Sequence, residues 1–339
     1  MQTFSIDSLA LHEMVVVPAF ADLVPQQFPF TGLLNEWTVM DNVASSRQII
    51  DIRRVQNILQ RRDASCDINY KKVVGATTRK IYTEEIYGAT AHCRQEFYQG
   101  CLKDWRAKDP VFGDKILPFF QQIIHTDVAS NCYFGDVDRV VPVGAQWSTN
   151  IFDGIFKWAK KYISAGVIPA SSTFQIADNT DFMANPELAY ALIEKLYQGQ
   201  SVMMRAFPAA QKAMYVTQQL ADGYQKYLQL FSKEKDGYTI LADGIQQLSY
   251  QRIPILVVDI WEPIIQELKG SHGHAAILTL RSNFVFGTDK TYGEGEDGKT
   301  ALMVWYERKD MQWYYQMFLK AGTQIGLPEF FVIAVSSWS

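Results

Sequence analysis

The C-terminal stretch from Ala301 to Ser337 constrains the fold more than any other part of this 339-residue chain. Aromatic and β-branched residues dominate it. Apolar side chains fall on alternate positions at Met311, Trp313, Tyr315, Met317 and Leu319. A period of two is typical of a strand with one buried face, so the stretch predicts long paired strands. A glycine-punctuated turn at Gly322 and Gly326 then leads into a final apolar strand, and earlier segments of the chain must cover this sheet.

Length and composition are those of a folded protein with extensive contacts. Apolar residues make up 48% of the chain and charged residues 20%, which is ordinary for one large globular domain or two. The aromatic fraction is high at 13%, and aromatic side chains are enriched in cores and in protein–protein contacts. The composition therefore favours large interfaces.

Charge and hydropathy argue against several classes of function. A net charge of −4 disfavours a general nucleic-acid binder, although it allows a container whose inner wall tolerates nucleic acid. No apolar run approaches the ~20 residues of a membrane span, and residues 1–10 lack the basic start of a signal peptide. The lack of CxxC spacing indicates reduced thiols. These are Cys66, Cys93, Cys101 and Cys132. We therefore expect a chain that folds in the cytoplasm and has no membrane partner.

The first ninety residues form two segments that cannot bury their own apolar side chains. Residues 1–45 have no sustained period and are punctuated by Pro18, Pro25 and Pro29, which predicts an extended arm lying on other protein. Residues 46–90 contain short β-prone runs, which predict a two-stranded hairpin with a basic, exposed surface. A lone hairpin is marginal in water, so this one needs a partner in the same chain or in another.

The cations of this hairpin suggest either nucleic-acid contact or a protein surface. They are Arg47, Arg53, Arg54, Arg61, Arg62, Lys71, Lys72, Arg79 and Lys80. Acidic residues interrupt the run at Asp51, Asp63 and Asp67. The mixture of charges favours a solvated or intersubunit face over nucleic-acid binding.

The middle of the chain alternates helical patterns with strands, which indicates an α+β fold. Apolar residues at three- and four-residue steps, with stop and start signals, predict several helices. Their ranges are 92–109, 115–133 ending at Gly135, 152–162 capped by Asn150, 188–197 after Asn185-Pro186, and 217–231 capped by Thr217. The run Ile253–Trp261 is too apolar for an exposed strand and is expected in the centre of a sheet. Residues 275–280 and 284–286 predict further strands.

One motif resembles a nucleotide-binding loop. Gly293 to Gly298 reads GxGxxG, but a phosphate cradle needs a strand before it and a helix after it. Here a strand follows, and three carboxylates lie inside the loop, so a solvated acidic turn is the better explanation. The same carboxylates with Asp289 could bind calcium, yet their spacing is not that of a helix–loop–helix site.

Histidines and cysteines give no stronger candidate for chemistry. His272 and His274 lack an obvious third metal ligand and are expected in a polar loop. The pairs His92–Cys93 and His125–Cys132 are poorly placed for a thiol nucleophile, because adjacent residues point apart and seven residues span two helical turns. We therefore predict no catalytic residue, no cofactor and no metal site.

The order of elements resembles the major capsid proteins of tailed phages, with the Hong Kong 97-type fold. Residues 120–136, ending in Gly135-Asp136, look like the end of the family's spine helix. Residues 152–163 resemble the short helix that follows it, and 214–224 resemble a helix start in the axial domain. Asp243-Gly244 with residues 253–259 is similar to its turn and "G-I-P-V" strand, although Arg252 stands where a glycine is common. Residues 275–289 and 320–329 are similar to closing strands.

This resemblance covers about residues 115–335 and implies a division of the chain. Residues 1–45 would be the N-terminal arm and 46–90 the extended β-hairpin loop. Residues 91–185 would form the peripheral domain with its long spine helix and β-sheet. Residues 186–290 would form the axial α/β domain, and 291–339 would return to the peripheral domain as C-terminal β-strands.

The resemblance also implies function and partners. The expected function is a structural one: self-assembly into an icosahedral shell around double-stranded DNA, with location in the virion after assembly in the host cytoplasm. Expected partners are copies of the chain in hexamers and pentamers, a portal, scaffolding or decoration proteins, and DNA held by weak non-specific contact. Two alternatives stay open, namely an encapsulin-type compartment shell and an α+β enzyme without a recognisable motif.

Overall fold

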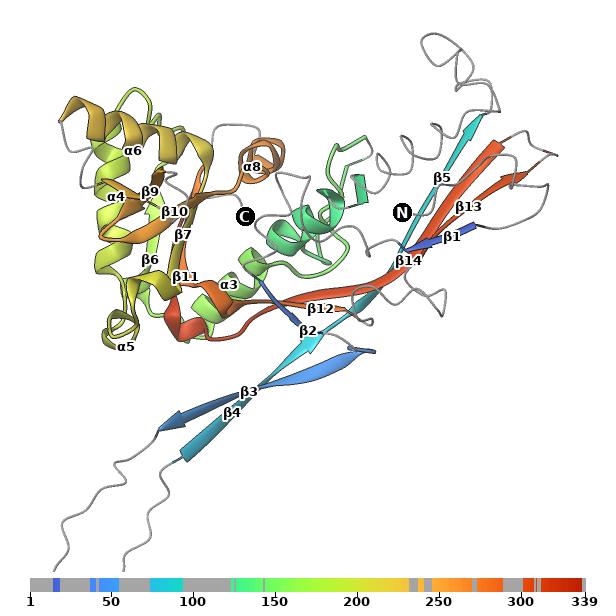
Figure 1. Cartoon of the computed structure of the whole chain (residues 1–339), viewed down its shortest axis with the longest axis horizontal. Helices are drawn as coiled ribbons and strands as arrows, with labels where there is room; N and C mark the ends of the chain where they lie inside the picture. Colours follow the sequence, from blue (N-terminus) through green and yellow to red (C-terminus); the bar gives the residue numbers. More distant parts are fainter. Residues whose placement is uncertain are drawn as a thin grey trace, which may run out of the picture.

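The computed structural model describes residues 15–18, 37–40, 43–54, 74–93, 123–124, 126–142, 144–231, 237–240, 246–269, 273–288, 301–307, 309 and 312–336. Within them the chain forms a seven-stranded sheet, a six-stranded sheet and a two-stranded ribbon. Figure 1 shows the seven-stranded sheet and its helices at one end of the molecule, the six-stranded sheet at the other, and the ribbon projecting from the body. The architecture is the mixed α+β class that the sequence predicts.

The seven-stranded sheet has the order β6–β15–β11–β7–β10–β9–β8. Its strands are β6 (Thr173–Ile176), β7 (Lys212–Val216), β8 (Tyr238–Ile240), β9 (Gln246–Tyr250), β10 (Ile253–Val257), β11 (Ala275–Leu280) and β15 (Phe331–Ser336), and the helices on it are α4 (Pro186–Gln198), α5 (Val202–Arg205) and α6 (Gln218–Leu230). Met214 and Val216 pack with α4 and α6, whereas Tyr215 between them belongs to a second cluster. Burial on both faces explains why β7 and β11, in the middle of the sheet, are mainly apolar.

The six-stranded sheet has the order β1–β13–β14–β12–β2, and β5 also pairs with β14. Its strands are β1 (Val15–Pro18), β2 (Thr38–Met40), β5 (Glu84–Cys93), β12 (Phe284–Thr288), β13 (Ala301–Glu307) and β14 (Gln312–Ile325). On β14, Tyr315 and Leu319 are buried and Phe318 between them is exposed, which confirms the predicted alternation. Of the predicted arm, the structure describes β1, Trp37, β2 and residues 43–45. Strands β1 and β2 lie on the chain's own sheet, so for these parts the expectation that the arm lies on other protein is wrong.

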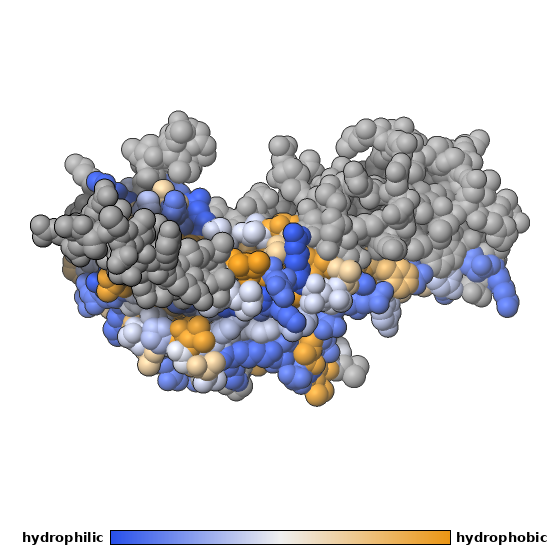
Figure 2. All heavy atoms as spheres, turned by 90° about the horizontal axis from the view of Figure 1, so that it is seen from below, coloured by the Kyte–Doolittle hydropathy of each residue, from blue (hydrophilic) through white to orange (hydrophobic). Residues whose placement is uncertain are grey.

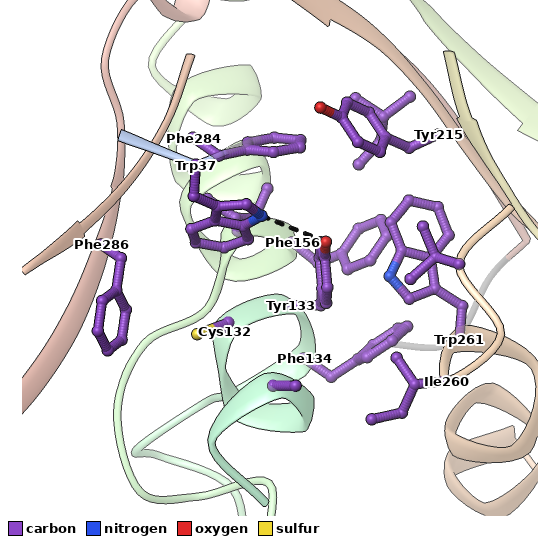
Figure 3. Packing of buried hydrophobic residues seen from close by; sticks show 14 of the residues in the cluster. Trp37, Cys132, Tyr133, Phe134, Phe156, Tyr215, Ile260, Trp261, Phe284 and Phe286 are labelled. Atoms are coloured by element: carbon purple, nitrogen blue, oxygen red, sulfur yellow. Dashed lines mark hydrogen bonds between the residues drawn. The ribbon is translucent and has the colours of Figure 1, made fainter. Parts of the chain in front are cut away.

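An aromatic cluster joins the two sheets (Figure 3). It includes residues of both sheets, of the helix at 126–134, of α3 (Ile155–Ser164) and of α8 (Trp261–Lys269). The ring of Tyr133 lies 5.3 Å from Trp37 and 5.3 Å from Trp261, and Trp37 Nε1 donates a hydrogen bond to its hydroxyl at 3.3 Å. Trp37 therefore fixes the described end of the arm in the centre of the molecule.

Most predicted helix ends are confirmed, with one exception. The helix predicted at 115–133 is helical over its described part, and α4 and α6 follow Asn185 and Thr217. Helix α3, however, begins after Gly154 and not after Asn150, so the predicted cap is wrong. The reason is that Asn131 Oδ1 accepts a hydrogen bond from Ile151 N at 3.1 Å and holds that segment against the preceding helix.

Three other predictions are wrong in part. His92 and Cys93 were expected to begin a helix, but they end strand β5, where they pair with Trp313 and Gln312; residues 94–109 lie outside the described part. The strand predicted for 253–261 ends at residue 257, and α8, which the sequence did not predict, begins at Trp261. The turn expected at Gly322 lies inside β14, which continues to residue 325.

Candidate functional site

A two-stranded ribbon is the most conspicuous surface feature. Strands β3 (Ser46–Arg54) and β4 (Val74–Tyr82) pair antiparallel, which confirms the predicted hairpin. The ribbon's inner face carries Ile81, which is buried with Val43 and Val285 on the six-stranded sheet, and Ile49, which is partly buried there. Figure 1 shows the ribbon running from this base away from the rest of the molecule.

Two glycines of the six-stranded sheet allow the ribbon base to approach closely. Gly287 on β12 and Gly322 on β14 are direct register partners. A Cβ added at Gly322 would lie 1.9 Å from the carbonyl oxygen of Tyr82, and one at Gly287 would lie 2.9 Å from the side chain of Ile81. These two positions are here called the glycine floor. A larger residue at Gly322 would push the ribbon off the sheet, whereas one at Gly287 would displace the end of the Ile81 side chain. The sequence carries a signal for this approach, because an isolated glycine inside a strand pattern marks a place where another backbone comes close.

Polar contacts hold the same base in place. Arg79 Nη1 donates to the carbonyl oxygen of Gly326 at 2.7 Å, and Arg79 Nη2 lies 3.4 Å from a carboxylate oxygen of Glu329. Gln324 Nε2 donates to the carbonyl oxygen of Lys80 at 3.0 Å, and Lys320 Nζ donates to that of Ala44 at 3.0 Å. These bonds fix the direction in which the ribbon leaves the body.

The outer face of the ribbon is exposed and partly apolar. The register places Ile50 beside Thr78 and Gln48 beside Lys80, with Tyr82 at the base. Ile50 is 60% exposed and Tyr82 is 53% exposed. On the side of the molecule seen in Figure 2, hydrophobic residues form small groups among hydrophilic ones. Two exposed apolar side chains therefore lie on this face, with Gln48 and Lys80 between them.

The predicted basic surface of the hairpin is confirmed in part. Arg47 and Lys80 are exposed, whereas Arg79 is half-buried by its contacts with Gly326 and Glu329. The side chains of Arg53 and Arg54 lie outside the described part, as do residues 55–73, which contain the remaining four cations. Arg79 thus has a structural role at the ribbon base.

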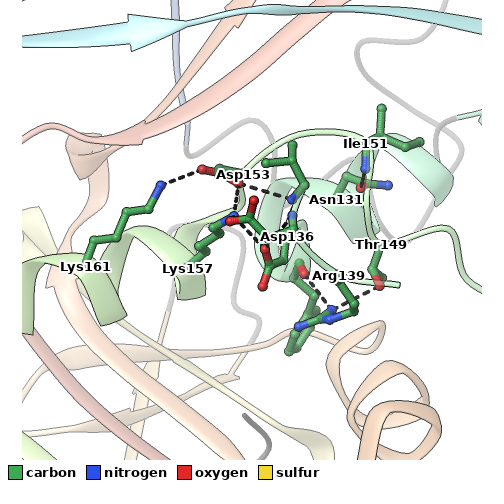
Figure 4. A network of polar contacts seen from close by, with 11 residues as sticks. Asn131, Asp136, Arg139, Thr149, Ile151, Asp153, Lys157 and Lys161 are labelled. Carbon is green, nitrogen blue, oxygen red and sulfur yellow. Dashed lines mark hydrogen bonds and ion pairs between the residues drawn. The ribbon is translucent and has the colours of Figure 1, made fainter. Parts of the chain in front are cut away.

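A polar network connects the 126–134 helix to α3 (Figure 4). Lys157 Nζ lies 2.6 Å from Asp136, 2.6 Å from Asp138 and 2.8 Å from Asp153, and Lys161 Nζ lies 2.7 Å from Asp153. Burial alone would lower the pKa of Lys157, but its hydrogen bonds to the three carboxylates together raise the pKa above its ordinary value. For Asp136, burial would raise the pKa, and the hydrogen bond from Lys157 outweighs it, so the pKa is lowered.

Behind this network two backbone segments cross at close range. Asn131 is fully buried, and its Nδ2 donates to the carbonyl oxygens of Asp127 at 2.8 Å and Ser148 at 2.5 Å. A Cβ added at Gly154 would lie 2.6 Å from the carbonyl oxygen of Asn131 and 2.6 Å from Gly135 N. The network therefore fixes the angle between the two helices, which is a structural role and needs no substrate.

Two of the side chains considered for chemistry, His274 and Cys132, lie in the described part of the chain. His274 lies in the loop before β11, as predicted, but its side chain is buried. Its Nε2 lies 2.9 Å from the carbonyl oxygen of Thr180, and its backbone N–H donates to Ser336 Oγ at 3.0 Å. Cys132 is buried in the aromatic cluster, and burial raises the pKa of its thiol. Residues 289–300, which contain GxGxxG and Asp289, lie outside the described part, as do Cys66, Cys101, His125 and His272.

Two negative findings apply to the described residues. None of their helices is long and apolar enough to cross a membrane. Among them, no group of three or more His, Cys, Asp or Glu side chains is placed to hold a metal ion.

Comparison with known proteins identifies the fold. No protein-family model and no curated protein matches the chain. Solved structures do match: a chain of the satellite phage P4 procapsid has 11% identity and a TM-score of 0.55 over 89% of this chain and 93% of that one. A chain of the capsid of Myoviridae phage XM1 has 11% identity and a TM-score of 0.53 over 93% and 95%. The chain has the fold of phage capsid proteins.

The capsid fold also matches a protein compartment. A chain of the holo-SrpI encapsulin complex from Synechococcus elongatus PCC 7942 has 11% identity and a TM-score of 0.51 over 92% of this chain and 89% of that one. Identities of this size establish the capsid fold alone. The function must therefore be inferred from the chain's own surfaces.

Proposed function

We propose that this chain is the major capsid protein of a tailed bacteriophage and self-assembles into an icosahedral shell around double-stranded DNA. The similarity to phage capsid structures over about nine-tenths of the chain supports this function. The observation that carries it is the outer face of the ribbon, where Ile50 and Tyr82 are more than half exposed on a structure that projects from the body. Such a face is stable when a second copy covers it.

The mechanism of assembly is geometric. Ile50 is 60% exposed in the single chain, so completing its burial contributes about 1–2 kcal/mol, and one shell repeats the same contact many times. Closed symmetry ensures that every ribbon finds a copy to cover it. The glycine floor and the Arg79 contacts fix the direction of the ribbon, so they determine where that copy must stand.

Each part of the chain has a role in this proposal. Residues 1–45 act as the N-terminal arm and 46–90 as the extended loop, although β5 begins in that range at Glu84 and pairs with β14. Residues 91–185 form the peripheral domain with its spine helix, residues 186–290 form the axial domain, and 291–339 supply the closing strands. The sheets cross these bounds, because β6 and β15 belong to the seven-stranded sheet and β12 belongs to the six-stranded sheet. The burial of β7 and β11 on both faces supports a rigid axial domain.

The proposed partners follow from a shell. Copies of the chain form hexamers and pentamers, and a portal, scaffolding proteins and decoration proteins complete the particle. The net charge of −4 is consistent with weak, non-specific contact to packaged DNA. The role is structural rather than enzymatic, and the protein belongs to the virion after assembly in the host cytoplasm.

A compartment shell with protein cargo is the second candidate, because the encapsulin structure has the same fold. The contents of purified particles distinguish the two. Nuclease-protected double-stranded DNA supports the phage shell, and a co-purifying enzyme without DNA supports the compartment.

Light scattering of three forms of the full chain tests the proposal. We expect megadalton particles for the wild type. Ile50→Asp should remain a subunit of 38.6 kDa with an unchanged unfolding temperature, because Ile50 is exposed in the single chain. The control Ile50→Val keeps an apolar side chain and should assemble. A wild type that stays monomeric at high concentration contradicts the proposal.

A further inference from the structure

One lysine of the seven-stranded sheet is buried without a negative charge beside it. Lys212 is the first residue of β7 and is only 4% exposed. Its Nζ donates a hydrogen bond at 2.9 Å to Oε1 of Gln200, which is a neutral partner. Within the described part of the chain, no carboxylate lies within ion-pair distance of this ammonium. Lysine is almost never fully buried unless it is paired, because a buried charge without a counter-charge is costly.

The position of Lys212 on β7 explains its burial. Side chains alternate along a strand, so Lys212 shares the face of Met214 and Val216, which pack with α4 and α6. The 3₁₀ turn Ala209–Gln211 contacts β7 and β10 at this end of the sheet. Gln200 is itself 5% exposed, and its Nε2 donates to the carbonyl oxygen of Tyr197 at 2.8 Å. The amide of Gln200 is therefore fixed with its oxygen toward the ammonium.

A second cation lies close to the first. Arg205, the last residue of α5, is exposed, and its Nη2 donates to the carbonyl oxygen of Gln198 at 2.6 Å. Among the described residues, the other donors of this guanidinium have no partner. Burial lowers the pKa of Lys212, and the positive charge of Arg205 lowers it further. Two like charges thus act on each other at the end of the sheet with no described acid between them.

Other lysines with little exposure show what this pair lacks. The side chain of Lys157 is 11% exposed and lies within 2.8 Å of three carboxylates. The side chain of Lys269 is 10% exposed and forms an ion pair with Asp178. Both are therefore compensated inside the chain, as buried cations usually are. Lys212 has only an amide oxygen, so its counter-charge must come from outside the described part of the chain.

We infer that Lys212 and Arg205 bind a phosphate-type dianion, with Gln200 holding the ammonium in place. Two positive charges without a described acid match a dianion, whereas a single carboxylate would compensate only one of them. The planar donors of a guanidinium fit phosphate oxygens, and an ammonium adds a point charge. The exposed side of Arg205 provides access from solvent. Free phosphate and the phosphate group of a mononucleotide have this chemistry in common. The inference goes beyond the proposed function, because it concerns a single subunit.

Thermal unfolding of dilute, full-length subunits tests the inference at fixed pH and fixed ionic strength. Phosphate should raise the unfolding temperature progressively with concentration, because a ligand that binds only the folded chain stabilises it. Acetate, which carries one charge, should have a much smaller effect. Adenosine monophosphate distinguishes the two sources. An effect equal to that of inorganic phosphate means that the phosphate group alone is recognised, and a larger effect means that the site takes a nucleotide.

Two substitutions locate the site. Lys212→Met keeps an apolar stem, and Arg205→Gln removes an exposed charge. Each should weaken phosphate binding by roughly tenfold or more, because each removes charged hydrogen-bond donors. Lys160→Gln, an exposed lysine on α3, is the matched control for the change in net charge and should bind like the wild type. In buffer without phosphate, Lys212→Met should be at least as stable as the wild type, since it removes an uncompensated buried charge.

Three results would overturn the inference. One is a wild type that phosphate stabilises no more than acetate does. Another is an equal effect of phosphate on the wild type and on Arg205→Gln, which would mean that phosphate acts elsewhere on the chain. The third is a loss of stability in Lys212→Met that is the same with and without phosphate, which is the behaviour of a purely structural lysine. If Lys212→Met does not fold, the comparison of Arg205→Gln with Lys160→Gln still decides.

Discussion

At the scale of single residues, glycines and buried polar side chains hold segments of the chain together where they cross outside the helices and strands. The glycine after the 126–134 helix was predicted as a stop, and the structure shows why it must be glycine: a Cβ on Gly135 would lie 1.9 Å from the carbonyl oxygen of Phe152. The role of Asn131 was not predicted, because a sequence alone does not show which buried side-chain amide will hydrogen-bond a loop 17 residues further along the chain. Local signals predict where helices end, and long-range contacts decide where the next one starts.

Asp127 provides a test of burial at this scale. Burial raises the pKa of its carboxyl to about 6, so the folded chain holds this proton more tightly than the unfolded chain. The free energy of unfolding should therefore fall between about pH 4 and pH 6 and stay lower above that range. Asp127→Asn removes the ionisable carboxyl and with it this fall in the free energy of unfolding. The substitution should stabilise the subunit at pH 7 by about 1 kcal/mol, after discounting for partial exposure.

Urea unfolding of dilute subunits at pH 4 and pH 7 measures this effect. The difference in unfolding free energy between Asp127→Asn and the wild type should be present at pH 7 and absent at pH 4. A difference of the same size at both pH values would mean that the charge of Asp127 is not its cause.

At the scale of elements, strands were predicted well where their apolar pattern is complete. The period of two on β14 and the apolar runs of β10 and β11 follow directly from burial on one or both faces. Helix α8 was missed because Trp261 continues the apolar run that precedes it, although it packs on Tyr133 in a different layer. The helix expected from His92 was wrong because pairing with β14 over ten residues, Glu84 to Cys93, outweighs local helical preference.

The glycine floor gives an element-scale prediction. In Gly322→Ala the new Cβ would meet the backbone carbonyl of Tyr82 at 1.9 Å, so the ribbon base must move. We expect a loss of about 1–3 kcal/mol in the free energy of unfolding, as for other overpacked sites. Gly326→Ala is the matched control, because its Cβ would have no neighbour nearer than 3.4 Å.

Chemical denaturation of the two dilute variants beside the wild type provides the measurement. Equal stability of Gly322→Ala and Gly326→Ala would show that the ribbon base does not lie on the glycine floor.

At the scale of the whole molecule, the order of elements predicted the capsid fold although no single motif did. The structure adds information that the order of elements cannot give, namely which faces of the sheets and of the ribbon are covered within one chain. Trp37 is buried in the aromatic cluster and Ile81 on the six-stranded sheet, whereas Ile50 and Tyr87 are exposed. The nucleotide and calcium hypotheses depended on residues 289–300. These residues lie outside the described part, so both hypotheses stay untested.

The central claim is that the ribbon is completed by other copies of the chain. Hydrogen–deuterium exchange of the amides in β3 and β4 tests it most directly, measured in assembled particles and in subunits diluted until they dissociate. We predict that exchange in these strands is at least roughly tenfold slower in the particle, while β7 and β11 exchange slowly in both states. Equally slow exchange of the ribbon in the isolated subunit would contradict the account, because the chain would then cover its ribbon without a second copy.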